Sequence, residues 1–157
     1  MQAIEVLPIA LLDGAIVSLK PEHAASFVVG WPAGAKPEQT AAAALTRLGL
    51  EAKVLHSTSW RHAGNEVVLT FLAVVPPGFK LPQSWQVAPV THTELARGDV
   101  TTPPPTIAVA QVLEHALRHL AWLVAEDEVI GRALPGWPAV LTAYVPEPFR
   151  GLGGIQP

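Results

Sequence analysis

The feature that most constrains the fold lies in residues 51–75, where a tight turn joins two predicted strands. The second strand, "EVVLTFLAVV", is apolar at almost every position, so both of its faces need to be covered. A strand buried on both faces is typical of the centre of a sheet. The first strand, "EAKVLHSTSWR", is joined to it by "HAGN", which indicates an antiparallel hairpin. The sequence therefore predicts a sheet with residues 66–75 at its centre.

Further strands are predicted on both sides of this hairpin. "IEVLPIALLDGAIVSLK" contains two extended segments around Asp13 and Gly14, a residue pair favoured in tight turns. "SFVVGW" is a third short strand. "SWQVAPV" is expected at the edge of the sheet, where Pro89, which has no N–H group, removes no ladder hydrogen bond. We therefore expect a mixed sheet within residues 4–90.

The longest predicted helix lies in "TIAVAQVLEHALRHLAWLVAED", which begins at residue 106. At about 100° per residue, one face of this helix is apolar; it consists of Val109, Leu113, Ala116, Leu117, Leu120, Leu123 and Val124. The opposite face is polar and aromatic, with Gln111, His115, Arg118, Trp122 and Glu126, and with His119 on its flank. Glu114 and Arg118 have the spacing of a helical salt bridge. We expect the stripe from Leu113 to Leu120 to pack on the sheet or on another helix.

Two shorter helices, "DEVIGRAL" and "WPAVLTAYV", are predicted to complete a helical part at residues 106–144. The stiff segment "TTPPP", residues 101–105, connects this part to the sheet. About 50 residues of helix make a poor core alone, so residues 1–157 are expected to form one domain. The predicted fold class is α/β (α+β): a mixed sheet with packed helices and a helical C-terminal segment.

Composition excludes several classes of function. The chain has 157 residues, of which 50% are hydrophobic and 15% charged, and a net charge of −3. Without a basic patch, no nucleic-acid partner is expected. The absence of cysteine excludes disulfides, thiolate metal sites and a cysteine nucleophile. There is no signal-peptide pattern, and the apolar run at residues 67–75 is too short to cross a bilayer. We expect a cytoplasmic protein with no membrane partner and no cofactor.

The segment "WPAGAKPEQTAAAALTRLGL", residues 31–50, has the form of a glycine turn followed by a helix. Pro37 suits the first helical position, Glu38 lies in the positive first turn, and Gly49 ends the predicted helix 37–48. With "ALLDGAIVSLK" before it and "EVVLTFLAVV" after it, this order of elements resembles that of Nudix domains. The resemblance covers about residues 4–76 and implies a Nudix-like sandwich.

The same segment departs from the Nudix box, Gx5Ex7REUxEExGU, in which U is aliphatic. Gly34 matches the box glycine, and Gly49 with Leu50 matches its end. Between them Glu38 is the only acidic residue, and Leu48 follows Arg47 where the box has a glutamate. One carboxylate cannot both hold a hard cation and polarise water. The magnesium-dependent pyrophosphate hydrolysis that the resemblance to Nudix domains implies is therefore expected to be lost, and no catalytic residue is assigned. A plain small-residue packing helix explains the segment equally well.

The best candidate ligand residues lie on the long C-terminal helix. His115 and His119 are one turn apart, a spacing that lets two imidazoles reach one metal ion. A third ligand is missing nearby, because Ala116 follows His115 where an H-E-x-x-H motif has its glutamate. We therefore predict a ligand-binding face of His115, His119, Trp122 and Glu126 and no metal site. On an exposed face, replacing both histidines with alanine should change stability little.

The segment "HSTSWR", residues 56–61, also combines reactive side chains. Strand alternation predicts His56, Thr58 and Trp60 on one side, and Ser57, Ser59 and Arg61 on the other. A Ser-His-acid triad has no support here, since neither serine lies in a G-x-S-x-G nucleophile elbow. These residues are expected to lie at an edge or to line a pocket.

Three hypotheses remain open from the sequence. The first is a catalytically degenerate Nudix-like protein that binds a small molecule or serves as an interaction module. The second is a metal-dependent hydrolase built on His115 and His119. The third is a homodimer in which the C-terminal helix pairs through Trp122. The sequence leaves open whether any catalysis remains.

Overall fold

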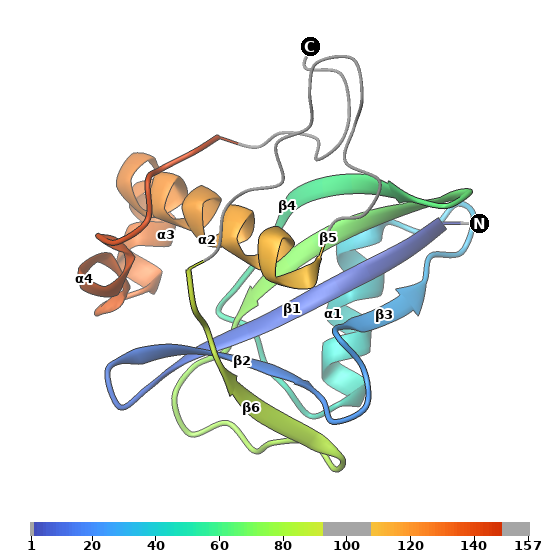
Figure 1. The fold of residues 1–157 in the computed structure, drawn as a ribbon, viewed down its shortest axis with the longest axis horizontal. Coiled ribbons are helices and arrows are strands. Elements are labelled where there is room, and N and C mark those ends of the chain that lie inside the picture. Colours follow the sequence, from blue (N-terminus) through green and yellow to red (C-terminus); the bar gives the residue numbers. More distant parts are fainter. Residues whose placement is uncertain (1, 93–107, 149–157) are drawn as a thin grey trace.

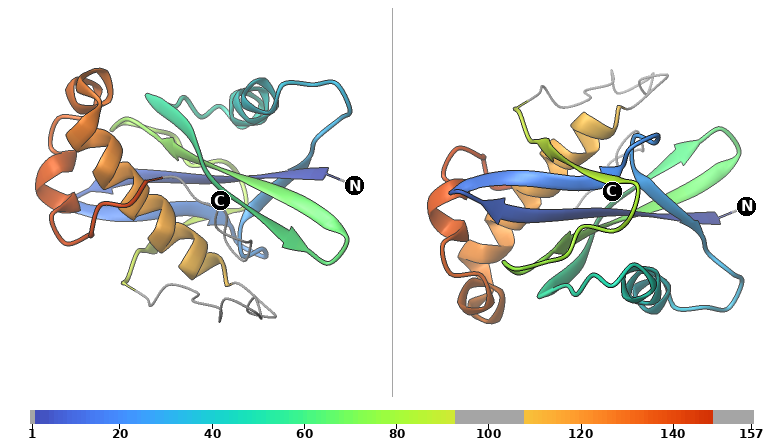
Figure 2. Two further views of the ribbon diagram at one scale, coloured as in Figure 1. Left: turned by 90° about the horizontal axis from the view of Figure 1, so that it is seen from above. Right: turned by 90° about the horizontal axis from the view of Figure 1, so that it is seen from below.

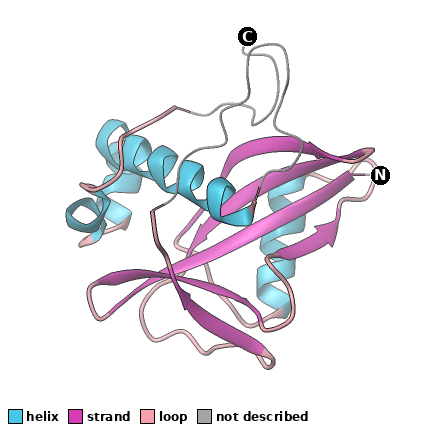
Figure 3. Ribbon diagram, viewed as in Figure 1, coloured by secondary structure: helices cyan, strands magenta, loops and turns pink. Residues whose placement is uncertain are grey.

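The computed structural model describes residues 2–92 and 108–148, and its centre is a six-stranded mixed sheet (Figures 1 and 3). The strand order is β4-β5-β1-β2-β6, and β3 also pairs with β1. The strands are β1 (Gln2–Leu12), β2 (Ala15–Pro21), β3 (Phe27–Gly30), β4 (Val54–Ala63), β5 (Glu66–Val74) and β6 (Trp85–Pro89). The helices are α1 (Pro37–Arg47), α2 (Val109–Glu126), α3 (Glu128–Ala133) and α4 (Trp137–Leu141). This confirms the predicted α+β class.

The centre of the sheet agrees with the prediction. β5 pairs antiparallel with β4 and parallel with β1, so it is flanked on both sides.

β1 is also central, and it contains Pro8. The carbonyl of Ile9 accepts from Val75 N on the β5 side, so the backbone of Pro8 faces the other neighbours. There the β3 register ends at Val6 and the β2 register begins at Ile9. The missing N–H group of Pro8 therefore falls in the gap between two partner strands.

Helices cover both faces of the sheet (Figure 2). On one face α1 buries Ala41, Ala44 and Leu45 in a core with alternate residues of β1 and β5, such as Ile4 and Phe71. On the other face α2, with Leu134, Trp137 and Leu141 of the following helical segment, packs on the remaining alternate residues; these are Leu7, Ile9, Leu72 and Val74. The predicted Leu113–Leu120 stripe does pack on the sheet, and the edge position of β6 is confirmed.

The polar face predicted for α2 is wrong in its middle turns. His115 is fully buried, and His119 and Glu114 are only 2% and 3% exposed. The cause is that α2 is covered on more than its apolar stripe: β4 lies against His115, and the segment that follows α4 returns along the helix. The connector predicted at residues 101–105 lies outside the described residues. Within the described residues, no helix is both long and apolar enough to span a membrane.

Candidate functional site

A hollow of about 620 Å³ lies along the outward side of α1, at the place of the segment that resembles the Nudix box. It runs from the end of β3 over the turn at Gly34 to Arg47. Its polar lining consists of Lys36, Gln39, Thr40 and Arg47, and its other lining residues are small or apolar. Among the lining residues there is no carboxylate. The hollow thus presents two cationic side chains and no carboxylate ligand for a hard cation such as magnesium.

The helix beside this hollow forms as the sequence predicts. Pro37 starts α1 and Arg47 is its last residue. Gly49 then adopts φ +71°, a left-handed conformation, and the N–H of Leu50 donates to the carbonyl of Leu45 at 3.0 Å. Glu38 is exposed and does not line the hollow. The only acidic residue between Gly34 and Gly49 therefore adds no carboxylate to the lining of the hollow.

On the opposite face of the sheet, His115 lies between β4 and the segment after α4. Its Nε2 donates to the carbonyl of Thr58 at 3.3 Å, and its Nδ1 is 3.5 Å from Oε2 of Glu147. Both ring nitrogens thus face oxygen acceptors. His56 of β4 also reaches this region, and its ring lies 5.3 Å from that of His119.

His119 is held by the same returning segment. Its Nδ1 donates to the carbonyl of Glu147 at 3.1 Å, and its ring stacks on Trp122 at 5.8 Å with 14° between the planes. Burial lowers the pKa of His119, and the neighbouring His56 and His115 lower it further, although the hydrogen bond to Glu147 opposes them. His119 is therefore stabilised in its neutral form.

A set of charges lies beside the two histidines. Arg118 Nε donates to Glu114 Oε1 at 3.2 Å, which confirms the predicted helical salt bridge. Arg118 Nη1 also donates to Glu147 Oε1 at 3.4 Å. The ring of Tyr144 lies 4.3 Å from that of His92. Burial raises the pKa of Tyr144, and the charge of Glu114 raises it further, so the phenol stays protonated.

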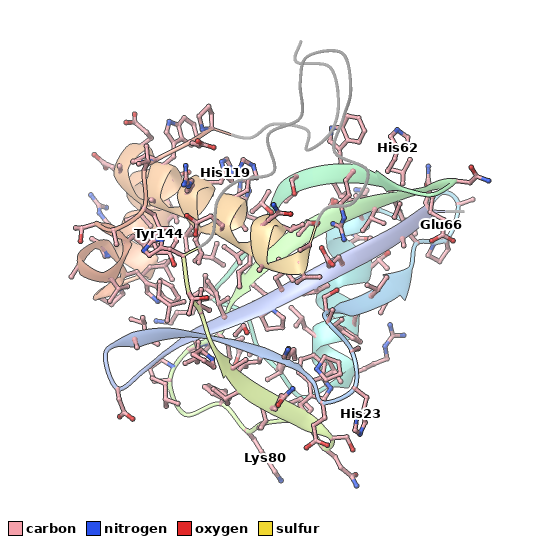
Figure 4. All side chains as sticks on the ribbon, in the orientation of Figure 1. His23, His62, Glu66, Lys80, His119 and Tyr144 are labelled. Carbon is pink, nitrogen blue, oxygen red and sulfur yellow. The ribbon has the colours of Figure 1, made fainter. Side chains whose placement is uncertain are left out.

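The four residues predicted as a ligand face differ in how far their side chains are exposed. His115 and His119 are buried, Trp122 is partly buried, and Glu126 is exposed at the end of α2. Figure 4 shows His119 on α2 and His62 well away from it on the β4–β5 hairpin, where the ring of His62 packs on Trp60. Within residues 2–92 and 108–148, no group of three or more histidine or acidic side chains is placed to hold a metal ion.

The alternation predicted for residues 56–61 is wrong because β4 contains a bulge. Ser57 pairs with Phe71 and Ser59 pairs with Thr70, so the register shifts between them. A bulge inserts one residue and turns those that follow to the other face. His56 therefore shares the α2 side of the sheet with Arg61, whereas alternation placed these two residues on opposite sides.

A second polar group, which the sequence analysis missed, lies on the same face. Arg61 donates from Nη1 and Nη2 to the two carboxylate oxygens of Glu5, at 2.8 and 3.0 Å. Thr70 donates to Glu5 at 3.1 Å and Ser26 at 2.6 Å. The Glu5 side chain is 1% exposed and that of Arg61 is 12% exposed. The signal available in the sequence was Glu5, a single acidic residue in an apolar strand, because a buried carboxylate needs a partner.

Comparison with known proteins supports the fold. No family model matches the sequence, and neither does any curated protein. Among solved structures, the chain is similar to NrtR of Shewanella oneidensis, a Nudix regulator, at a TM-score of 0.64 and 12% identity. The match covers 92% of this chain and 79% of that chain. NrtR complexed with a 27mer DNA matches equally, with 92% and 77% covered.

A third similar structure is the C. elegans Ap4A hydrolase, at 16% identity over 57% of this chain and 80% of that chain. Its TM-score of 0.42 is too low to support an argument. The likeness to NrtR, together with the mixed sheet between helices, shows that the fold is Nudix-like and confirms the fold that the resemblance implied. An identity of 12% transfers no residue's role.

Proposed function

We propose that this protein is a catalytically degenerate Nudix-like binding module. The observation that carries the proposal is the hollow beside α1, which keeps its glycine turn and helix while no carboxylate lines it. Holding magnesium and activating water both need carboxylates, so the hollow lacks the means for metal-assisted hydrolysis. Lys36 and Arg47 favour an anionic ligand, either a small molecule or an acidic surface of a partner protein.

The face of His115, His119, Trp122 and Glu126 is proposed as a second ligand surface. It cannot line the α1 hollow, because α1 and α2 lie on opposite faces of the sheet. Trp122, partly buried and stacked on His119, is the member that we expect to touch a ligand, and Glu126 is exposed one turn further along. A homodimer that pairs through Trp122 uses the same surface and is tested by sedimentation of Trp122→Ala.

The proposal is tested by incubating the protein with nucleoside diphosphate derivatives and magnesium. We expect no turnover above the rate without protein, and binding by calorimetry that weakens in Lys36→Ala and Arg47→Ala. Lys80→Ala, an exposed cation outside the hollow, is the matched control. Turnover that disappears in Glu38→Gln would contradict the loss of catalysis. Binding unchanged by Lys36→Ala and Arg47→Ala would contradict the assignment of the hollow.

A metal-dependent hydrolase built on His115 and His119 is the alternative, and no specific observation favours it. It predicts stoichiometric zinc in the purified protein, lost in His115→Ala.

A nucleic-acid partner was not expected from the charge of the chain, yet the similar NrtR is known as a DNA complex. The absence of a nucleic-acid partner therefore stays a prediction, to be checked by a gel shift with duplex DNA. A cytoplasmic location is likewise proposed.

A further inference from the structure

One residue of the returning segment, Glu147, is bound through all of its polar groups by a single turn of α2. Its N–H donates to the carbonyl of Arg118 at 3.1 Å, and its carbonyl accepts from Nδ1 of His119 at 3.1 Å. Its Oε1 accepts from Arg118 at 3.4 Å, and its Oε2 lies 3.5 Å from Nδ1 of His115. The turn thus recognises both a peptide backbone and a carboxylate.

The side chains of this turn are also held by contacts other than those with Glu147. Arg118 Nε donates to Glu114, which is 3% exposed, and this hydrogen bond orients the guanidinium group. His115 is fixed from behind by the carbonyl of Thr58 in the β4 bulge. Charged hydrogen bonds with fixed geometry are stronger and more specific than those made by mobile surface side chains. The binding groups are therefore arranged in advance for an acidic residue.

The bound segment has the character of a ligand more than that of a core element. Val145 is 62% exposed, and Pro146 and Pro148 are exposed as well, so little apolar surface holds the segment down. The two prolines restrict the backbone on both sides of Glu147 to extended conformations. A pre-extended segment loses less conformational entropy when it binds. The contacts of Glu147 are therefore the main attachment of this segment to α2.

We propose that the α2 turn at residues 115–119 is a binding site for an acidic peptide segment, and that the chain fills it with its own residues 145–148. The ligand class is an extended peptide with a glutamate between residues that favour extended backbone. The attached segment acts as a competitor with a millimolar effective concentration. A peptide from a partner enters only when it displaces Glu147. This site does not depend on the proposed function of the α1 hollow, which lies on the other face.

The test uses full-length protein and a fluorescent peptide, AYVPEP, copied from residues 143–148, with AYVPQP as its matched control. We expect Glu147→Ala to bind AYVPEP at least about tenfold more tightly than the wild type, because the internal competitor is weakened. AYVPQP should bind Glu147→Ala about tenfold less tightly than AYVPEP. Equal binding of the two peptides, or no binding of AYVPEP to Glu147→Ala, would overturn the proposal. Glu128→Ala, which removes an acid that is 86% exposed just beyond the end of α2, should behave like the wild type.

A second measurement serves if Glu147→Ala does not fold. Glu147→Gln keeps the size of the side chain and the backbone contacts but removes the charge. We expect hydrogen exchange of the amide at position 147 to become about tenfold faster than in the wild type, with circular dichroism unchanged. Unchanged exchange would mean that the carboxylate does not hold the segment, and the proposal would be wrong.

Discussion

The two faces of the sheet are covered by helices of opposite character. α1 buries only Ala41, Ala44 and Leu45, and its charged residues remain in solvent or line the hollow. α2 is buried almost all round its middle turns, with Glu114 and two histidines inside. Small residues let α1 lie close to the sheet with one side free. Polar residues in α2 are enclosed because other segments satisfy their hydrogen bonds.

Because of this difference, an experiment on the α1 side can change a binding function without changing stability, whereas one on the α2 side changes both. On the α1 side, a charge can be changed without leaving a buried group unpaired. On the α2 side, most polar side chains are bound to other segments, so a substitution alters the fold as well as any site. The predictions that follow test this contrast, from the largest expected effect to the smallest.

Glu5→Ala should destabilise the protein by about 3–5 kcal/mol, because it leaves Arg61 inside the protein without its carboxylate. Urea unfolding followed by circular dichroism measures the loss. Glu128→Ala is the matched control, since it breaks the ion pair with Arg132 whose side chains are 86% and 83% exposed. That variant should stay within about 0.5 kcal/mol of the wild type. A small effect of Glu5→Ala would show that the network contributes little.

His115→Ala should destabilise by about 2–4 kcal/mol, since it opens a cavity and leaves the carbonyl of Thr58 without its donor. This reverses the expectation from the sequence that the histidine pair can be removed with little change. The exposed His62 provides the comparison, as His62→Ala should change the free energy of unfolding by about 0.5 kcal/mol or less. Similar values for the two variants would contradict the burial of His115.

The pH dependence of stability should reveal His119. Its folded pKa lies below the ordinary value of 6.5, so the unfolded chain binds a proton more readily than the folded one. Its contribution is complete above pH 6.5 and is lost as the pH falls from 6.5 towards the folded pKa, with a slope of at most about 1.4 kcal/mol per pH unit. Urea unfolding between pH 5 and 8 (about the range in which histidine titrates) should show a shallower slope in His119→Gln. An unchanged slope would exclude His119 as its source.

Arg47→Ala should have the smallest effect on stability, within about 0.5 kcal/mol, because the residue ends a solvent-facing helix and lines an open hollow. Thermal unfolding checks this value, and ligand binding to the same variant should still weaken. A large loss of stability would mean that the α1 side also depends on its charges, and the contrast between the two faces would fail.

The sequence by itself determined the elements and the centre of the sheet. The apolar run in residues 66–75, the Asp13-Gly14 turn and the Pro37 and Gly49 helix signals are local, and each has one favourable structure. For this reason α1, from Pro37 to Arg47, and the central position of β5 follow the prediction closely. The sequence also shows directly that Glu38 is the only acidic residue between Gly34 and Gly49.

Only the tertiary structure decided which polar residues are buried and what they touch. Periodicity assigns a helix one covered side, but α2 has neighbours on several sides, and His115 meets Thr58 and Glu147 from distant parts of the chain. The bulge in β4 is set by its pairing with β5, and together with the pairing of β5 and β1 it brings Arg61 to Glu5, 56 residues away. Such contacts depend on the relative placement of segments, because a hydrogen bond needs a distance that no local pattern specifies.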